Sequence, residues 1–115
     1  MHITARKFDD IAVLNLVGRL TINDGVDELR DTVAGAIAAG HPKVVINLAN
    51  VPYIDSPALG ELVHCLTSTR RAKGTVKLVG MNGRVVSLLT IMKLTAEFDM
   101  FDTEQEAVDS FLATA

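Results

Sequence analysis

The sequence predicts one α/β domain over residues 1–115, with a mixed, mostly parallel sheet of four to five strands and four helices. Three observations predict this architecture. Short β-branched runs alternate with segments whose apolar residues recur at helical spacing. The first two runs are so close together that only a hairpin can join them, which makes that pair antiparallel. Each later run follows a helical segment, and strands joined through a helix are parallel, with right-handed crossovers.

The N-terminal part of the chain has the pattern of a hairpin followed by a helix. Residues 2–7 and 11–17 have the composition of strands. The cluster Asn23-Asp24-Gly25 is typical of a helix start, and Gly40 and Pro42 are stop signals. The apolar residues of this helix are Val26, Leu29, Val33, Ala36 and Ile37.

The rest of the chain repeats the pattern of strand and helix. The expected strands cover residues 43–48, 75–79 and 98–101. A helix from Ser56 to about Ala72 follows the first of them, and the helix after the second has the apolar residues Val85, Leu88, Leu89 and Met92. The terminal helix has the buried residues Ala107, Val108, Phe111 and Leu112. Thr103 and Glu106 form a capping box before that last helix. If the strands are added in sequence order, right-handed crossovers place the connecting helices on one face and leave the other face comparatively bare.

Composition and charge limit the classes of function. A hydrophobic content of 49% supports a real core. The net charge of −3, from 11 basic and 14 acidic residues, argues against nucleic-acid binding. No apolar run approaches the ~20 residues of a membrane span and no signal-peptide pattern is present, so we expect a cytoplasmic protein. The single cysteine, Cys65, excludes an internal disulfide and is expected to pack rather than react.

The stretch Asp55-Ser56-Pro57 stands between the strand over residues 43–48 and the helix that follows it. Proline is favoured at the first position of a helix and forces the residue before it into extended geometry. Ser56 is therefore expected to be the N-cap, with its hydroxyl accepting from an amide of the first turn. Loops at the carboxyl ends of parallel strands usually carry function in α/β folds, and this junction is one of them.

The residues around Ser56 do not support catalysis. Asp55, Ser56 and His64 are the residue types of a hydrolase triad. However, the helix separates Ser56 from His64 by about 12 Å along its axis, whereas a nucleophile and its base must lie within ~3 Å of each other. The histidines and Cys65 share no ligand spacing. We therefore expect no catalytic residue, no metal and no cofactor.

Ser56 fits better as an acceptor of phosphate. A phosphate at a helix N-terminus would meet free amides and the positive end of the helix dipole, so the fold would tolerate it. The same charge of about −2 would repel a partner that had closed over this corner, particularly beside Asp55. Phosphorylation would then preserve the fold and abolish binding.

These residues resemble those of the STAS domains of bacterial anti-sigma factor antagonists. The resemblance runs from residues 11–18 through residues 44–48, the Ile54-Asp55-Ser56 signature and Leu59-Gly60 to the closing strand and helix over residues 98–112. It implies a βα fold of the kind derived above and a protein that is not an enzyme. It also implies two partners: an anti-sigma factor with serine kinase activity, and a serine phosphatase that resets the system.

The resemblance further implies that Ser56 is the phosphorylated serine and that Asp55 is its acidic neighbour. Family members commonly follow this serine with Ser-Gly, whereas this chain has Pro57-Ala58, which stiffens the segment that a kinase would grip. The predicted partner-binding residues, on the exposed side of the helix, are Asp55, Ser56, Gly60, Glu61 and His64. The alternative is a non-switching STAS subunit, a structural or accessory module of a larger assembly such as a stress-signalling scaffold or a lipid-transport complex.

Overall fold

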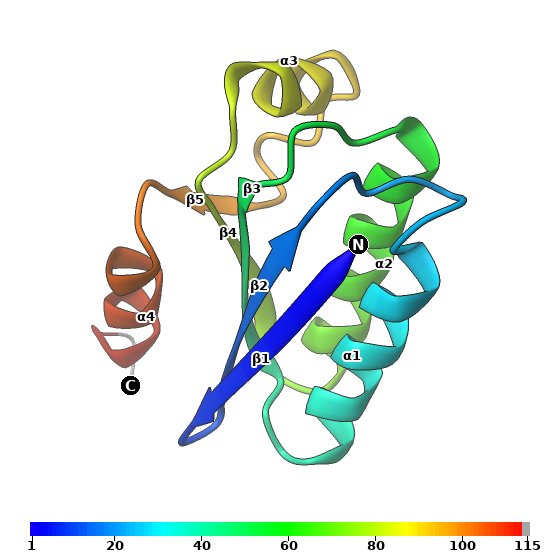
Figure 1. The fold of residues 1–115 in the computed structure, drawn as a ribbon. Helices are drawn as coiled ribbons and strands as arrows, with labels where there is room; N and C mark the ends of the chain where they lie inside the picture. The colour runs from blue at the N-terminus through cyan, green and yellow to red at the C-terminus, as the bar shows by residue number, and fades with distance from the viewer. Residues whose placement is uncertain (114–115) are drawn as a thin grey trace.

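Five strands form one mixed sheet, in which they lie in the order of the sequence (Figure 1). The structure is a computed structural model that describes residues 1–113, except for the side chain of Phe8. The strands are β1 (His2–Phe8), β2 (Ile11–Val17), β3 (Lys43–Asn50), β4 (Thr75–Val79) and β5 (Asp99–Phe101). The helices are α1 (Val26–Ala38), α2 (Ser56–Arg71), α3 (Gly83–Ile91) and α4 (Glu104–Ala113).

The pairing of the strands confirms the predicted fold class. β1 is antiparallel to β2 through a tight hairpin, and β2 to β5 pair in parallel. Parallel neighbours end at the same edge of a sheet, so the loops that follow β2, β3 and β4 meet at one edge. The junction that contains Ser56 lies at this edge, after β3.

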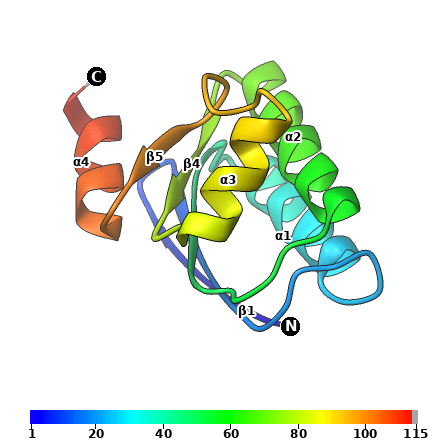
Figure 2. The ribbon, with the colours of Figure 1, turned by 90° about the horizontal axis from the view of Figure 1, so that it is seen from above.

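The larger core lies on the face of the sheet that α1 and α2 cover. Figures 1 and 2 show α3 on the same side, above the carboxyl ends of the strands. The fully buried large side chains of this core include Leu14, Leu16, Leu29, Ile46, Leu59, Leu62, Leu78 and Leu89. Each such side chain stabilises the fold by roughly 1.5–3 kcal/mol through removal from water, which fixes the helices to the sheet.

The second face of the sheet is not bare, contrary to the expectation from the crossovers, because α4 packs on it (Figure 2). The handedness rule applies to helices that connect two parallel strands, and α4 follows the last strand. A second core cluster forms here from Ile11, Val13, Val45, Val79, Ala107, Val108 and Phe111. Leu112, which the sequence assigns to this buried side, is 55% exposed.

Polar contacts also hold α4 to the sheet. The side-chain amide of Asn47 in β3 donates to Glu104 at 2.7 Å, and Arg6 in β1 forms an ion pair with the same carboxylate. The hydrogen bond from Asn47, and then the hydrogen bond and the charge of Arg6, lower the pKa of Glu104. The first bond of the capping box is confirmed, because the Glu106 amide donates to the Thr103 hydroxyl at 3.2 Å. The Glu106 carboxylate accepts from that hydroxyl at 3.0 Å.

The starts and ends of the other helices differ in detail from the prediction. The residue before α1 is Gly25, with a φ of 97°, and no side chain caps this helix. Asp24 binds the N-terminal amine of Met1 at 3.0 Å instead of capping α1. Met92 lies just beyond α3 and is 42% exposed, so it is not part of the buried side of that helix.

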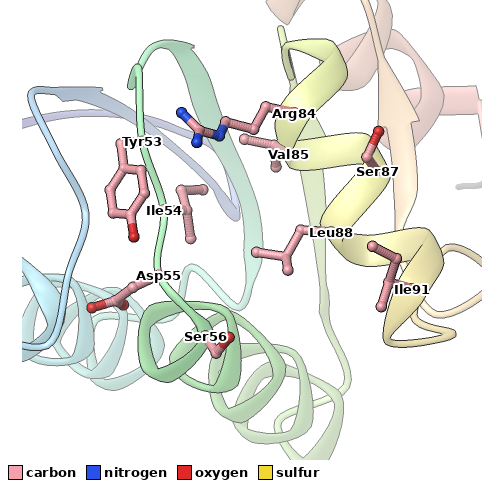
Figure 3. Close-up of a pocket in the computed structure, with 9 residues that line it drawn as sticks. All are labelled: Tyr53, Ile54, Asp55, Ser56, Arg84, Val85, Ser87, Leu88 and Ile91. Carbon is pink, nitrogen blue, oxygen red and sulfur yellow. The ribbon is translucent and has the colours of Figure 1, made fainter.

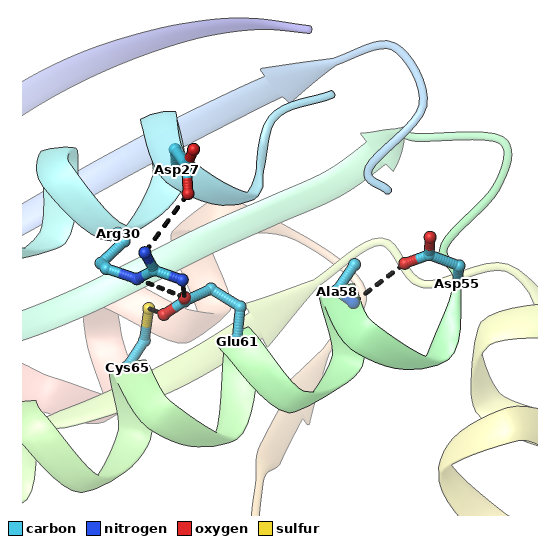
Figure 4. A network of polar contacts seen from close by, with 6 residues as sticks. All are labelled: Asp27, Arg30, Asp55, Ala58, Glu61 and Cys65. Carbon is cyan, nitrogen blue, oxygen red and sulfur yellow. Dashed lines mark hydrogen bonds and ion pairs between the residues drawn. The ribbon is translucent and has the colours of Figure 1, made fainter. Parts of the chain in front are cut away.

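The prediction that Ser56 caps α2 is wrong, because Asp55 is the N-cap and Ser56 is the first helical residue. Asp55 has extended geometry, with φ −91° and ψ 171°, and its Oδ1 accepts from the Ala58 amide at 2.9 Å (Figure 4). Its Oδ2 accepts from the amide of Ile22 at 3.0 Å. Asp is as good an N-cap as Ser. Pro57 has no N–H to offer, so the first amide beyond it that needs an acceptor is that of Ala58, which Asp55 reaches.

Removal of the Asp55 carboxylate should destabilise the protein. Asp55→Ala deletes both a cap and the hydrogen bond to the Ile22 amide, so we expect a loss of about 1–3 kcal/mol in the free energy of unfolding, measured by urea denaturation. Ser56→Ala is the matched control and should change it by less than about 0.5 kcal/mol. Equal losses in the two variants would contradict the assignment of the cap.

Glu104 should make stability depend on pH. A carboxylate whose pKa is lower in the folded chain than in the unfolded chain stabilises the fold at pH above its unfolded pKa, and this contribution is lost as the pH falls through the folded pKa. At pH 7 the free energy of unfolding should therefore be higher for wild type than for Glu104→Gln. This difference between the two proteins should shrink below about pH 4. Urea unfolding of both proteins at pH 7 and at about pH 3 tests this. An excess that is the same at both pH values would refute it.

Candidate functional site

Two loops at the carboxyl edge of the sheet are bonded together and position Ser56. The amide of Gly18 donates to the Asn50 carbonyl at 3.1 Å, and the amide of Leu20 donates to the Tyr53 carbonyl at 3.0 Å. The amide of Asp55 completes the set by donating to the Leu20 carbonyl at 3.3 Å. These bonds continue the parallel pairing of β2 and β3 past the strand ends, so the start of α2 is held by the sheet.

Ser56 lines a pocket of about 360 Å³ between the loop before α2 and helix α3 (Figure 3). The other residues that line it are Tyr53, Ile54, Asp55, Arg84, Val85, Ser87, Leu88 and Ile91. Ser56 is exposed, and within residues 1–113 no hydrogen-bond partner is found for its hydroxyl. Ile91 is 76% exposed at the rim, so the pocket has an apolar edge beside the serine.

Two arginines lie on the ring of Tyr53 at this corner. The guanidinium of Arg19, from the loop after β2, is 4.9 Å from the ring centroid. The guanidinium of Arg84, from α3, is 5.5 Å from it. Two loops and the start of α3, which follow three successive strands, thus bring two cations and one aromatic ring to this edge of the sheet. Periodicity and motifs do not single out these three residues, although their positions after successive strands are a signal that could have found them.

The first turn of α2 offers little to an anion. Pro57 has no N–H, and the amide of Ala58 is bonded to Asp55. The amide of Leu59 donates to the Asp55 carbonyl. Only the N–H of Ser56 remains of the first-turn amides, so a phosphate here would meet fewer free amides than expected.

A second hollow, of about 700 Å³, lies on the other side of the start of α2, toward α1. Gly60 and His64 line it and are exposed, as the sequence predicts. Ile22 stands at its edge and is 61% exposed, although its amide is held by Asp55. Ile22 is not among the predicted partner-binding residues, and the signal that could have found it is a large apolar residue inside a polar turn cluster.

Glu61 is buried, so the prediction that it belongs to the exposed side of α2 is wrong. It is 4% exposed, and its carboxylate accepts from Nε of Arg30 in α1 at 2.7 Å and contacts Nη2 of the same side chain at 2.6 Å (Figure 4). The physical reason is that α1 lies alongside α2, so α2 is covered on two sides, by the sheet and by α1. Helical spacing within α2 cannot indicate the second neighbour.

Cys65 belongs to the same buried cluster. Its thiol contacts the Glu61 carboxylate at 3.6 Å. Burial, and then the negative charge of Glu61, raise the pKa of the Cys65 thiol to about 12. A thiol that stays protonated is a poor nucleophile, so the expectation that Cys65 packs rather than reacts agrees with its surroundings.

In the part of the chain that the structure describes, we find no arrangement of Ser56 and His64 for catalysis, no metal site and no membrane-spanning helix. Ser56 faces the pocket toward α3, whereas His64 lines the hollow toward α1. The two are therefore not arranged as nucleophile and base. Among residues 1–113 no group of three or more His, Cys, Asp or Glu side chains could hold a metal ion. No helix in this range has the length and apolar character needed to cross a membrane.

Comparison with known proteins agrees with this geometry. A protein of Thermotoga neapolitana, provisionally named an anti-sigma factor antagonist and TM1081 homolog, is 36% identical over 70 residues. That segment is 61% of this chain and 62% of the relative, so the match spans less than two thirds of the relative's length. The crystal structure of TM1081 from Thermotoga maritima, provisionally named an anti-sigma factor antagonist, has a TM-score of 0.85 at 27% identity, covering 94% of this chain and 92% of that one.

A structure of SpoIIAA from Bacillus in its phosphorylated form has a TM-score of 0.76 at 20% identity, covering 96% of this chain and 99% of that one. At this identity the likeness concerns the fold. The model of the STAS domain family matches residues 2–107, from β1 into α4. By this match over nearly the whole length, the chain belongs to the STAS domain family.

Proposed function

We propose that this protein is an anti-sigma factor antagonist that binds an anti-sigma factor with serine kinase activity and is released when Ser56 is phosphorylated. The observation that carries the proposal is an exposed serine hydroxyl, free of partners in the described chain, at a rigidly held corner between two surface hollows. The relatives named as anti-sigma factor antagonists support the general role. The existence of a phosphorylated form of SpoIIAA supports the idea that phosphorylation controls partner binding.

The proposed docking surface comprises Ser56, Gly60, His64 and the exposed Ile22. Ile22 offers an apolar anchor, and Gly60 allows close approach because, apart from its chain neighbours and the backbone of its own helix, no atom lies within 4 Å of where a Cβ would be. Asp55 acts by holding this surface in place, since both of its oxygens bond to backbone amides. Glu61 is excluded from the surface by its burial. We also propose that the protein acts in the cytoplasm and that it binds its partner without catalysing a reaction.

The covalent cycle that follows involves two partner enzymes. The kinase transfers the γ-phosphoryl group of ATP to Oγ of Ser56, so that a new P–O bond forms, the β–γ bond of ATP breaks, the hydroxyl proton passes to a base of the kinase and ADP leaves. A serine phosphatase later hydrolyses the phosphoester with water to restore the hydroxyl and release inorganic phosphate. The added charge of about −2 lies on the docking surface and repels the bound partner.

A second candidate is a non-switching STAS subunit in a larger assembly. The observation in its favour is Pro57, which fixes the backbone immediately after Ser56 and removes an amide from the first turn. In this role the protein would bind through the same docking surface, but Ser56 would not be phosphorylated. Phosphorylation assays separate the two candidates.

Incubation with ATP and an anti-sigma kinase should add one phosphoryl group, located on Ser56 by mass spectrometry. Ser56→Ala should abolish the addition, because the hydroxyl is the acceptor. Ser87→Ala is the matched control, since Ser87 lines the same pocket from α3, and it should leave the addition intact. No addition to wild type, with partner binding unaffected by Ser56→Asp, would exclude the switch and favour the second candidate.

A bulky side chain at position 60 should block docking. The Cβ of Gly60→Trp has open space, and its ring would fill part of the hollow between α1 and α2, so the affinity for the anti-sigma partner should fall at least about tenfold. Gly35→Trp is the matched control, because Gly35 is also helical with no atom within 4 Å of where a Cβ would be, but lies on α1 away from Ser56. Calorimetric titration measures both affinities. Equal effects of the two changes would contradict the assigned surface.

A further inference from the structure

The pocket beside Ser56 is mostly apolar inside. Ile54 and Val85 are buried in its walls, Leu88 is half-buried, and the exposed Ile91 forms part of the rim (Figure 3). Concave, mostly apolar hollows with a few polar groups are the usual form of small-molecule sites, and about 360 Å³ falls within their usual range of roughly 300–1,000 Å³. The pocket therefore suits a small ligand whose body is apolar.

The two sides of this pocket are tied together without any ligand. The side-chain amide of Asn82, which caps α3, donates to the Val51 carbonyl in the loop before α2 at 3.4 Å. The carbonyl of Tyr53, further along that loop, accepts from the Leu20 amide. A ligand would therefore not have to order these segments, which is a cost that lowers affinity. The position also favours a site, because ligands of parallel α/β sheets usually bind outside the carboxyl ends of the strands.

The pocket is positive at one end. Arg84 lies beside Tyr53 at the end opposite Ser56, with Ile54 and Leu88 between them (Figure 3). Its guanidinium is 5.5 Å from the centroid of the Tyr53 ring, and in the described chain no carboxylate is found at ion-pair distance from it. Arg84 is in the first turn of α3, so the positive end of that helix dipole lies at the same end of the pocket.

The carboxylate that lines the pocket, that of Asp55, lies at the Ser56 end (Figure 3). Both of its oxygens accept from backbone amides, which hold it in the junction at the start of α2. The remaining titratable side chain of the lining is Tyr53. Arg19 contacts the same ring but lines a separate hollow. An anionic head group is therefore favoured at the Arg84 end of the pocket.

We propose that this pocket binds a small amphipathic carboxylate, with an aliphatic or aromatic body on Ile54, Val85 and Leu88 and with the carboxylate at Arg84. Removal of the body from water supplies most of the affinity. An exposed ion pair adds little to it, but a guanidinium can bind both oxygens of a carboxylate, so Arg84 selects the sign of the head group. This inference adds a ligand to the proposed function and does not depend on it.

Sodium octanoate is the probe, and octylammonium chloride, with an alkyl chain of similar length and the opposite charge, is the matched control ligand. Titration of ¹⁵N-labelled full-length protein at one ionic strength, followed by amide NMR shifts, should show saturable octanoate binding with a Kd on the order of 1 mM. The largest shifts should fall in residues 53–56 and 84–91, and octylammonium should bind at least about threefold more weakly. Shifts that do not saturate by about 20 mM, shifts that lie elsewhere, or equal affinities for the two ligands would overturn the proposal.

Two pairs of variants test the assigned residues. Arg84→Gln should weaken octanoate binding roughly two- to fivefold and leave octylammonium binding no weaker, whereas Arg71→Gln, at the far end of α2, should change neither. Leu88→Trp should fill the pocket and abolish octanoate binding, whereas Val86→Trp, at an α3 position outside the lining, should retain it. Octanoate binding that survives Leu88→Trp, or equal effects of the two arginine changes, would contradict the proposal. No kinase or anti-sigma partner takes part, so this result and that of the kinase assay are independent.

Discussion

The geometry of the site depends on one carboxylate, that of Asp55. One of its oxygens accepts from Ala58 and so fixes the first turn of α2, and the other accepts from Ile22 in the loop after β2. The same residue donates its own amide to the carbonyl of Leu20. Asp55 therefore joins two loops and a helix at the carboxyl edge of the sheet, and both surface hollows beside Ser56 take their shape from this junction.

The way in which Asp55 caps α2 changes the electrostatics expected of Ser56. A helix start with free amides is a ready-made anion site, and a phosphate there would need no further support. Here Asp55 occupies the Ala58 amide and Pro57 removes another, so a phosphate on Ser56 would lie beside a carboxylate with little help from the backbone. Because Ser56 is exposed, water rather than the helix start would solvate most of the charge of such a phosphate.

Periodicity and turn chemistry are local signals, and they predict most of the fold. The hairpin, the parallel strands, the four helices and the capping box of α4 follow from alternation and spacing that can be seen within a few residues. The exposure of Gly60 and His64 is predicted in the same way. The family resemblance, carried by the signature that ends in Ser56, is confirmed by the match over residues 2–107.

The errors arise where distant segments meet. Glu61 is buried because α1 brings Arg30 to it, and spacing within α2 contains no information about that neighbour. The burial of Lys77 in β4, on which no prediction was made, has the same kind of cause. It is 6% exposed because α4 returns over it, and its Nζ lies 4.2 Å from the centroid of the Phe111 ring. At the start of α2, two adjacent residues are both good caps, and local propensity does not separate Asp from Ser. The amide of Ile22, which is distant in sequence, gives Asp55 a second bond.

The central claim is that a phosphate on Ser56 releases a partner from a surface that otherwise keeps its shape. The most direct measurement is the affinity of the anti-sigma partner for unmodified protein and for protein carrying phosphoserine at position 56, by calorimetric titration at one ionic strength. We predict a loss of at least about 100-fold, because about −2 charges would be buried against the partner without compensation from it. Affinities that agree within about twofold would contradict the account.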